Sequence, residues 1–259
     1  MIRLVPVLAV IALIASSCVE AACACAPPTL FVYAAASLGQ AVDEMKAAYP
    51  EGFGRLVPST GSSAALRTQI EQGAPADLFL SADTSNPQAL VDLGLTTGPA
   101  VPFATNGLTI VVPEGNPAAI TSPADLAGAG VAIIAAGENV PITKYADELV
   151  ARLALQPGYP PDFAAQYAAN VASREDDVRA VLAKIALGEG DAAIVYRTDA
   201  RAADVEIVAI PDAANVVATY AGVVLHRTGH PVASRRLLDW IRGPEGWAIL
   251  SRLGFSPAP

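Results

Sequence analysis

The chain has 259 residues, of which 53% are hydrophobic, and its formal net charge at pH 7 is -9. This length and apolar content suffice for a sizeable core and for two lobes, and they exclude an intrinsically disordered protein. The basic residues are scattered rather than clustered, which argues against nucleic acid as a partner. An acidic protein can still bind an anion where the local field is positive.

The first residues are typical of an export signal. A charged start at Arg3 precedes an apolar run over 4–15, and small residues suitable for cleavage follow. We therefore expect residues 1–26 to be a signal peptide and the mature protein to be periplasmic. All three cysteines lie in or beside this segment, so the mature body has no disulfide and no thiol ligand. Cys18 follows a partial lipoprotein cleavage box, which leaves a lipid-anchored form as an alternative to simple secretion.

Apolar strands and amphipathic helices alternate along the rest of the chain, which is typical of α/β proteins with parallel layers. Strands are predicted over residues 30–34, 54–58, 77–81, 107–113, 131–135, 191–196 and 205–210. Helices are predicted over 38–49, 65–72, 143–155 and 179–188, with a further amphipathic helix near 237–247. A Pro/Gly/Asn cluster after Pro113 indicates a boundary into a second unit, and the tail beyond Pro231 is expected to return to the first.

Four predicted helices begin with small or uncharged residues and no basic one. Ser37 precedes the first, Ser63 lies at the start of the second, and Ile142 and Val178 lie at the starts of the other two. A helix start leaves backbone N–H groups unpaired and carries partial positive charge, so several converging starts can hold an oxyanion without a cation. Taken singly, a serine at such a position is usually only an N-cap, and a branched apolar residue usually belongs to the core.

Several segments resemble periplasmic molybdate-binding proteins, the solute receptors of molybdate ABC importers. They keep the family's order over essentially the whole mature chain: VYAAASL at 32–38, GSS at 61–63, QIEQGAPADLFLSAD at 69–83, GEGDAAIVY at 188–196 and LGF at 253–255. The resemblance implies the two-lobed type II periplasmic binding protein fold. In that fold each lobe is a mixed, mostly parallel sheet flanked by helices, and the ligand lies in the cleft between the lobes. We expect residues 29–108 and 219–259 to form lobe 1 and residues 109–218 to form lobe 2.

The resemblance also implies a set of ligand-binding residues. The family's oxyanion ligands fall on Ser37 and Ser63 in the first lobe and on Ile142, Val178 and Tyr196 in the second. Ile142 and Val178 would act through backbone N–H groups and Tyr196 through its phenol. Toward a dianion all five supply only donors, which suits a fully deprotonated tetrahedral oxyanion, whereas a protonated phosphate also needs an acceptor.

The expected function is therefore that of a monomeric periplasmic receptor that binds molybdate, and tungstate, between two lobes and delivers it to the permease of an ABC importer. No cofactor, no enzymatic activity and no direct protein ligand to the metal atom are expected. Two departures from the family pattern bear on details. Ile142-Thr143 replaces a small pair that family members often carry, so the Ile142 side chain is expected to reshape the pocket, and the segment 156–173 is longer than usual.

Two other functions stay open at this point. One is a receptor for another small oxyanion such as sulfate, because fold alone does not separate the ligands. The other is an exported hydrolase with Ser37 or Ser63 as nucleophile, although neither serine lies in a Gly-x-Ser-x-Gly or Ser-x-x-Lys pattern. The only histidines, His226 and His230, fall in a predicted surface turn and offer little for a metal site.

Overall fold

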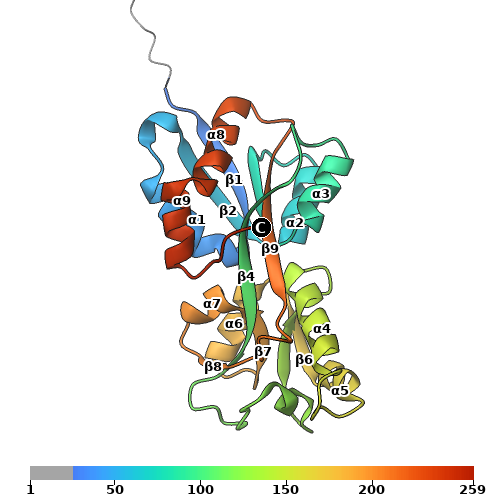
Figure 1. Ribbon diagram of the computed structural model, residues 1–259. Helices are drawn as coiled ribbons and strands as arrows, with labels where there is room; N and C mark the ends of the chain where they lie inside the picture. Colours follow the sequence, from blue (N-terminus) through green and yellow to red (C-terminus); the bar gives the residue numbers. More distant parts are fainter. Residues whose placement is uncertain (1–25) are drawn as a thin grey trace, which may run out of the picture.

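The computed structural model describes residues 26–259, which form two lobes joined by long strands (Figure 1). The predicted signal peptide, with Cys18, lies outside the described residues except for its last position. Helices flank the sheets in both lobes, as the alternation of predicted strands and helices requires. The two-lobed α/β architecture expected from the sequence is confirmed.

The first lobe is built around strand β1 (Thr29–Ala35), whose residues Leu30 and Val32 are buried. This strand runs parallel to β2 (Arg55–Gly61) and β3 (Leu78–Ser81), and β3 pairs antiparallel with β9 (Val217–Val224). The helices of this lobe are α1 (Gly39–Ala48), α2 (Ser63–Glu71), α3 (Ser85–Asp92), α8 (Pro231–Arg242) and α9 (Pro244–Arg252), with 3-10 turns at Ala36–Leu38 and Glu51–Phe53. Each fully buried Leu or Val side chain contributes about 1.5–3 kcal/mol to folding.

The second lobe holds shorter strands and the remaining helices. Strand β5 (Ile133–Ala136) runs parallel to β6 (Val171–Glu175) and touches the end of β7 (Ala193–Tyr196) through a bridge from Ile133 to Ala192. A short strand, β8 (Glu206–Val208), lies at the edge. The helices are α4 (Pro141–Leu153), α5 (Phe163–Ala169), α6 (Val178–Ala186) and α7 (Arg197–Arg201), with a 3-10 turn at Pro123–Ala127.

Strand β4 (Val101–Val112) runs between the lobes (Figure 1). Its first half pairs antiparallel with β9, from Val101 to Gly107, and its second half pairs with β7 and β8, from Leu108 to Val112. The main sheet therefore has the order β2-β1-β3-β9-β4-β7. Strands β4 and β9 extend across the gap between the lobes, and we refer to them as the hinge strands.

The sequence predicted most of these elements but only part of the hinge. The second half of β4 was predicted from its apolar run, whereas the first half of β4 and the whole of β9 were not. Strand β6, in the second lobe, was not predicted either. Strand β9 reads VATYAGVV, in which the small residues Ala and Gly dilute the apolar signal. In the tail, α8 packs on β9 and α9 packs beside α1 (Figure 1).

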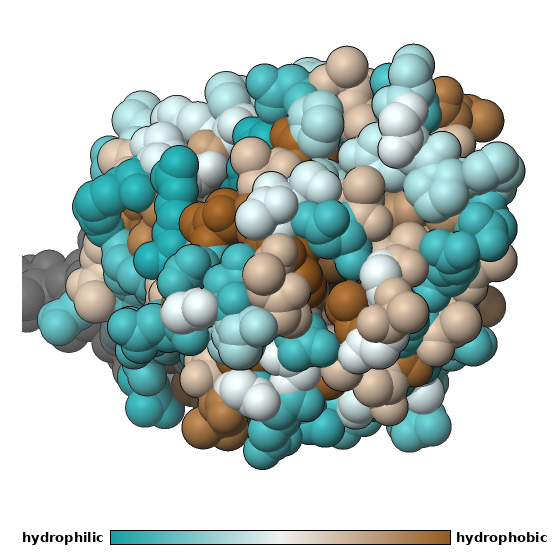
Figure 2. Space-filling model, turned by 90° about the horizontal axis from the view of Figure 1, so that it is seen from below, coloured by the Kyte–Doolittle hydropathy of each residue, from teal (hydrophilic) through white to brown (hydrophobic). Residues whose placement is uncertain are grey.

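Viewed from the end of the second lobe, the surface carries hydrophobic side chains as patches among hydrophilic ones (Figure 2). Isolated exposed apolar residues such as Leu187 and Ile207 are normal on a soluble surface. Within the described part of the chain, none of the helices combines the length and apolar character that a bilayer crossing requires.

Candidate functional site

A small cavity between the lobes brings all five predicted ligand residues together. Its volume is about 10 Å³, which is about the space that one water molecule needs. The cavity is lined by Ala35, Ala36, Ser37, Gly61, Ser62, Ser63, Ala82, Val140, Pro141, Ile142, Asp177, Val178 and Tyr196. No lysine or arginine is part of this lining, so an anion here would meet uncharged donors.

The first lobe contributes two buried serine hydroxyls, and each already has a hydrogen-bond partner. Ser63 is the first residue of α2, and its Oγ accepts a bond of 3.1 Å from the backbone N–H of Ala82. Ser37 lies in the 3-10 turn before α1, with its Oγ 2.9 Å from the phenol oxygen of Tyr220. Because the Ala82 N–H can only donate, the Ser63 hydroxyl proton is left for a group in the cavity.

The second lobe contributes the starts of two helices. Ile142 is the second residue of α4, after Pro141, and Val178 is the first residue of α6. The N–H groups of a first helical turn have no partner inside the helix. Asp177 caps α6, since its Oδ1 accepts from the N–H groups of Arg179 and Ala180 at 2.9 and 3.0 Å, which leaves the Val178 N–H outside this cap.

Tyr196 ends strand β7 and is 1% exposed, yet its hydroxyl has no hydrogen-bond partner among the described residues. A buried hydroxyl without a partner costs free energy, and Tyr196 lines the cavity, so an acceptor bound there could pair with this hydroxyl. Burial, followed by the nearby Tyr220 and Tyr145, raises the pKa of Tyr196 well above its ordinary value. The phenol therefore keeps its proton and can only be a donor toward an anion.

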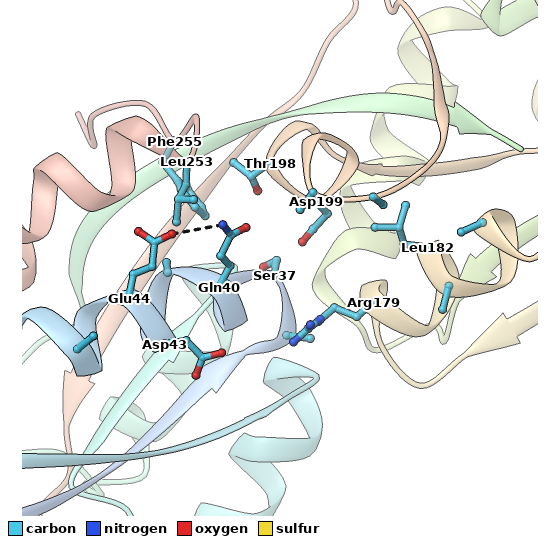
Figure 3. Close-up of a pocket in the computed structure, with 17 residues that line it drawn as sticks. Ser37, Gln40, Asp43, Glu44, Arg179, Leu182, Thr198, Asp199, Leu253 and Phe255 are labelled. Atoms are coloured by element: carbon cyan, nitrogen blue, oxygen red, sulfur yellow. Dashed lines mark hydrogen bonds between the residues drawn. The ribbon is translucent and has the colours of Figure 1, made fainter. Parts of the chain in front are cut away.

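A wider cleft of about 680 Å³ opens beside the small cavity and shares Ala36 and Ser37 with it (Figure 3). Gln40, Asp43 and Glu44 of α1 line one side, and residues of α6 and α7 line the other. This cleft carries carboxylates as well as Arg179, so it suits a small dianion less well than the small cavity does. We therefore take the small cavity as the site.

The Arg179 side chain of the second lobe lies close to the first lobe. A Cβ atom added to Gly39, at the start of α1, would lie 2.5 Å from Nη1 of Arg179, which belongs to α6 in the other lobe. A side chain at this position would displace the flexible end of Arg179. The arginine side chain in Figure 3 extends from α6 toward α1 and does not line the small cavity.

Asp199, in the first turn of α7, is the one strongly perturbed carboxyl group near the site. Burial raises its pKa to about 7, Asp177 adds to the rise, and Arg179 opposes it. Its Oδ2 has no hydrogen-bond partner among the described residues. Its charge also acts on the phenols of Tyr196 and Tyr220, so this carboxyl lies within electrostatic range of the cavity.

Neither serine has the surroundings of a catalytic nucleophile. Among residues 26–259, the Ser37 hydroxyl is hydrogen-bonded to a phenol and the Ser63 hydroxyl to a backbone N–H. Neither partner is a histidine or a carboxylate. His226 and His230 are exposed near the start of α8, as the sequence predicted. The described residues also contain no group of three or more His, Cys, Asp or Glu side chains arranged to hold a metal ion.

The residues behind the cavity wall were not singled out from the sequence. Tyr220 and Asn106 lie within apolar stretches of β9 and β4, where both are almost fully buried. A polar residue inside an apolar strand requires a hydrogen-bond partner, and that requirement is the signal that points to them.

The fold and this cavity define a two-lobed binding protein that encloses a small solute between its lobes. Comparisons with known proteins agree with this class of protein. The chain matches the family model for bacterial extracellular solute-binding proteins over residues 30–256. It belongs to this family, whose members are binding proteins of transport systems and not enzymes.

Individual relatives and solved structures make this comparison more specific. The chain is 36% identical over 234 residues to the molybdate-binding protein ModA of Mycobacterium tuberculosis, covering 88% of this chain and 84% of that protein. A periplasmic molybdate-binding protein of Azotobacter vinelandii has a similar structure, with a TM-score of 0.74 at 21% identity over 89% of this chain and all of that one. The sulfate-binding protein SubI of M. tuberculosis is also similar, with a TM-score of 0.77 at 21% identity over 89% and 87% of the two chains. These two structures confirm the type II periplasmic binding fold.

Proposed function

We propose that this protein is the extracytoplasmic receptor of a molybdate ABC importer and that it binds molybdate, and tungstate, in the small cavity. The ligand donors are the hydroxyls of Ser37 and Ser63, the backbone N–H groups of Ile142 and Val178, and the phenol of Tyr196. The observation that carries the proposal is their convergence on one cavity without a lysine or arginine in its lining. The similarity to the mycobacterial molybdate-binding protein over 88% of the chain supports the choice of ligand.

The proposed mechanism is closure of the lobes about β4 and β9. We divide the lobes at the predicted positions, with 29–108 and 219–259 on one side and 109–218 on the other. An oxyanion that contacts donors from both lobes binds the closed form more tightly and shifts the population toward it. The closed, monomeric protein would then present one joined surface to the membrane permease, after export directed by the signal peptide at 1–26.

Selectivity would come from the donors themselves. A fully deprotonated dianion can accept a hydrogen bond from every group in the ring, whereas protonated phosphate needs an acceptor for its own hydroxyl. Asp177 is the only charged residue in the described cavity lining, and its Oδ1 already accepts two backbone N–H groups. Sulfate carries the same charge as molybdate but is smaller, so cavity size is the remaining criterion.

Isothermal titration calorimetry of the mature protein with molybdate, tungstate, sulfate and phosphate tests this function. We expect molybdate and tungstate to bind with similar affinities and sulfate and phosphate to bind far more weakly. Sulfate binding as tight as molybdate binding would instead make the protein a receptor for another oxyanion. Phosphate binding as tight as molybdate binding would contradict the role of the donor-only ring.

A further inference from the structure

Four buried polar side chains form a connected network directly behind the cavity. The Ser37 Oγ lies 2.9 Å from the Tyr220 phenol oxygen, and Asn106 Nδ2 lies 3.5 Å from that same oxygen. Asn106 Nδ2 also donates to the Thr198 Oγ1 at 2.8 Å. The network therefore runs from the first lobe, through both hinge strands, to helix α7 of the second lobe.

Tyr220 is the centre of this network and is held rigidly. It is 0% exposed, and its ring makes edge contacts with the rings of Tyr196, Phe255 and Phe103, at centroid distances of 5.7, 5.4 and 6.2 Å. Burial, together with the charge of Asp199, raises the pKa of the Tyr220 phenol well above its ordinary value. This hydroxyl therefore always has a proton to donate.

The direction of the hydrogen bonds decides what Ser37 can offer to a ligand. A serine hydroxyl has a single proton, so Ser37 can donate that proton either to Tyr220 or to a group in the cavity. The amide nitrogen of Asn106 carries two hydrogens and can donate to both Thr198 and Tyr220. With its oxygen accepting from Asn106, the Tyr220 hydroxyl can donate to Ser37, which leaves the Ser37 proton free to point into the cavity.

The hydroxyl proton of Ser63, in the same cavity, is already oriented by a protein donor. Its Oγ accepts from the backbone N–H of Ala82, a group that cannot accept in return, so its proton is directed away from that partner. When the Tyr220 hydroxyl donates to Ser37, it has the same effect on Ser37 as the Ala82 N–H has on Ser63. The two serine hydroxyls are then both donors toward an anion, each fixed by a protein donor behind it.

We propose that Tyr220 is a positioning residue for oxyanion binding: its phenol donates to Ser37 and orients the Ser37 hydroxyl proton toward the anion, while Asn106 holds the phenol in this state. The inference rests on the proposed function, since it needs an anion that accepts from Ser37. The energetic gain is that of a charge-assisted hydrogen bond whose donor is already oriented before the ligand arrives.

A double-mutant cycle tests this role. Molybdate affinity is measured by calorimetry for the wild type, Tyr220→Phe, Ser37→Ala and the double variant. We expect Tyr220→Phe to weaken binding about tenfold. In the Ser37→Ala background the same change should have little further effect, because Tyr220 acts through Ser37. Tyr49→Phe is the matched control, since Tyr49 is also buried and its hydroxyl has no partner among the described residues.

The outcomes separate the alternatives. Unchanged affinity in Tyr220→Phe, or an equal loss in the Ser37→Ala background, overturns the proposal; the second result would mean that the phenol acts on the hinge and not on the serine. If Tyr220→Phe does not fold, as judged by thermal unfolding without ligand, Asn106→Ala takes its place in the cycle, with an expected loss of about threefold that also vanishes without Ser37. A wild-type protein that does not bind molybdate refutes the proposed function, and the positioning role with it.

Discussion

The two sides of the small cavity use different chemistry for the same task. The first lobe offers side-chain hydroxyls, Ser37 and Ser63, each with a protein partner behind it. The second lobe offers the backbone at two helix starts, Ile142 and Val178, and the unpartnered phenol of Tyr196. A side-chain donor is lost when its side chain is truncated. A backbone N–H donor is kept in every substitution except that by proline. The comparison teaches that mutational sensitivity at this site depends on which atom donates, not on which residue lines the cavity.

The largest expected effect is at Val178, where the side chain and the donor can be separated. Proline is tolerated at the first position of a helix, and the extended backbone of Asp177 before it suits a proline, so Val178→Pro should keep α6. It removes the N–H and should weaken molybdate binding at least about 100-fold, because a charge-assisted bond is lost and the ring blocks its place. Val178→Ala keeps the donor and should stay within about threefold of the wild type. Similar calorimetric affinities for the two variants would show that the Val178 N–H is not a ligand.

On the first-lobe side, Ser63→Ala should weaken molybdate binding about 30-fold, since it removes a hydroxyl donor that Ala82 already orients. Ser59→Ala changes an exposed serine of the neighbouring strand β2 and serves as the control. Fluorescence titration of both variants is sufficient for this measurement. Equal affinities for Ser63→Ala and Ser59→Ala would remove Ser63 from the site.

Molybdate affinity should also depend on pH through Asp199. Its pKa is raised to about 7 by burial and Asp177 against the opposing effect of Arg179, so it gains a negative charge as the pH rises through that value. A bound dianion disfavours this charge, so affinity should fall by about tenfold between roughly pH 6 and pH 8. In Asp199→Asn the affinity should be nearly independent of pH over this range. A wild-type profile as flat as that of the variant would mean that Asp199 does not interact with the ligand.

The smallest effect is expected at Ile142, because only its backbone is proposed to donate. Ile142 is 2% exposed, so Ile142→Val should lower the free energy of unfolding by about 0.5–1.5 kcal/mol. Molybdate affinity should change by no more than about twofold. Chemical denaturation and calorimetry on the same sample separate the two quantities. A loss of affinity without a loss of stability would contradict this prediction and show that the Ile142 side chain shapes the pocket.

The sequence predicted the two-lobed fold, most of the strands and five of the residues that line the cavity, but the helix starts alone did not establish that these five converge. The backbone donors at Ile142 and Val178 were assigned by family resemblance, because an N–H group leaves no trace in residue type. Asn106 and Tyr220 were missed for a physical reason. Their roles depend on the pairing of β4 with β9, which joins residues more than 100 positions apart, and β9 itself has a weak strand pattern.

The most direct test of the whole account is a crystal structure of the mature protein with molybdate, in which the anomalous signal locates the metal atom. We predict that the ion lies in the small cavity, with its oxygens within hydrogen-bond distance of Ser37, Ser63, Tyr196 and the N–H groups of Ile142 and Val178. An ion bound in the wider cleft, or held mainly by Arg179 or another cationic side chain, would contradict the account.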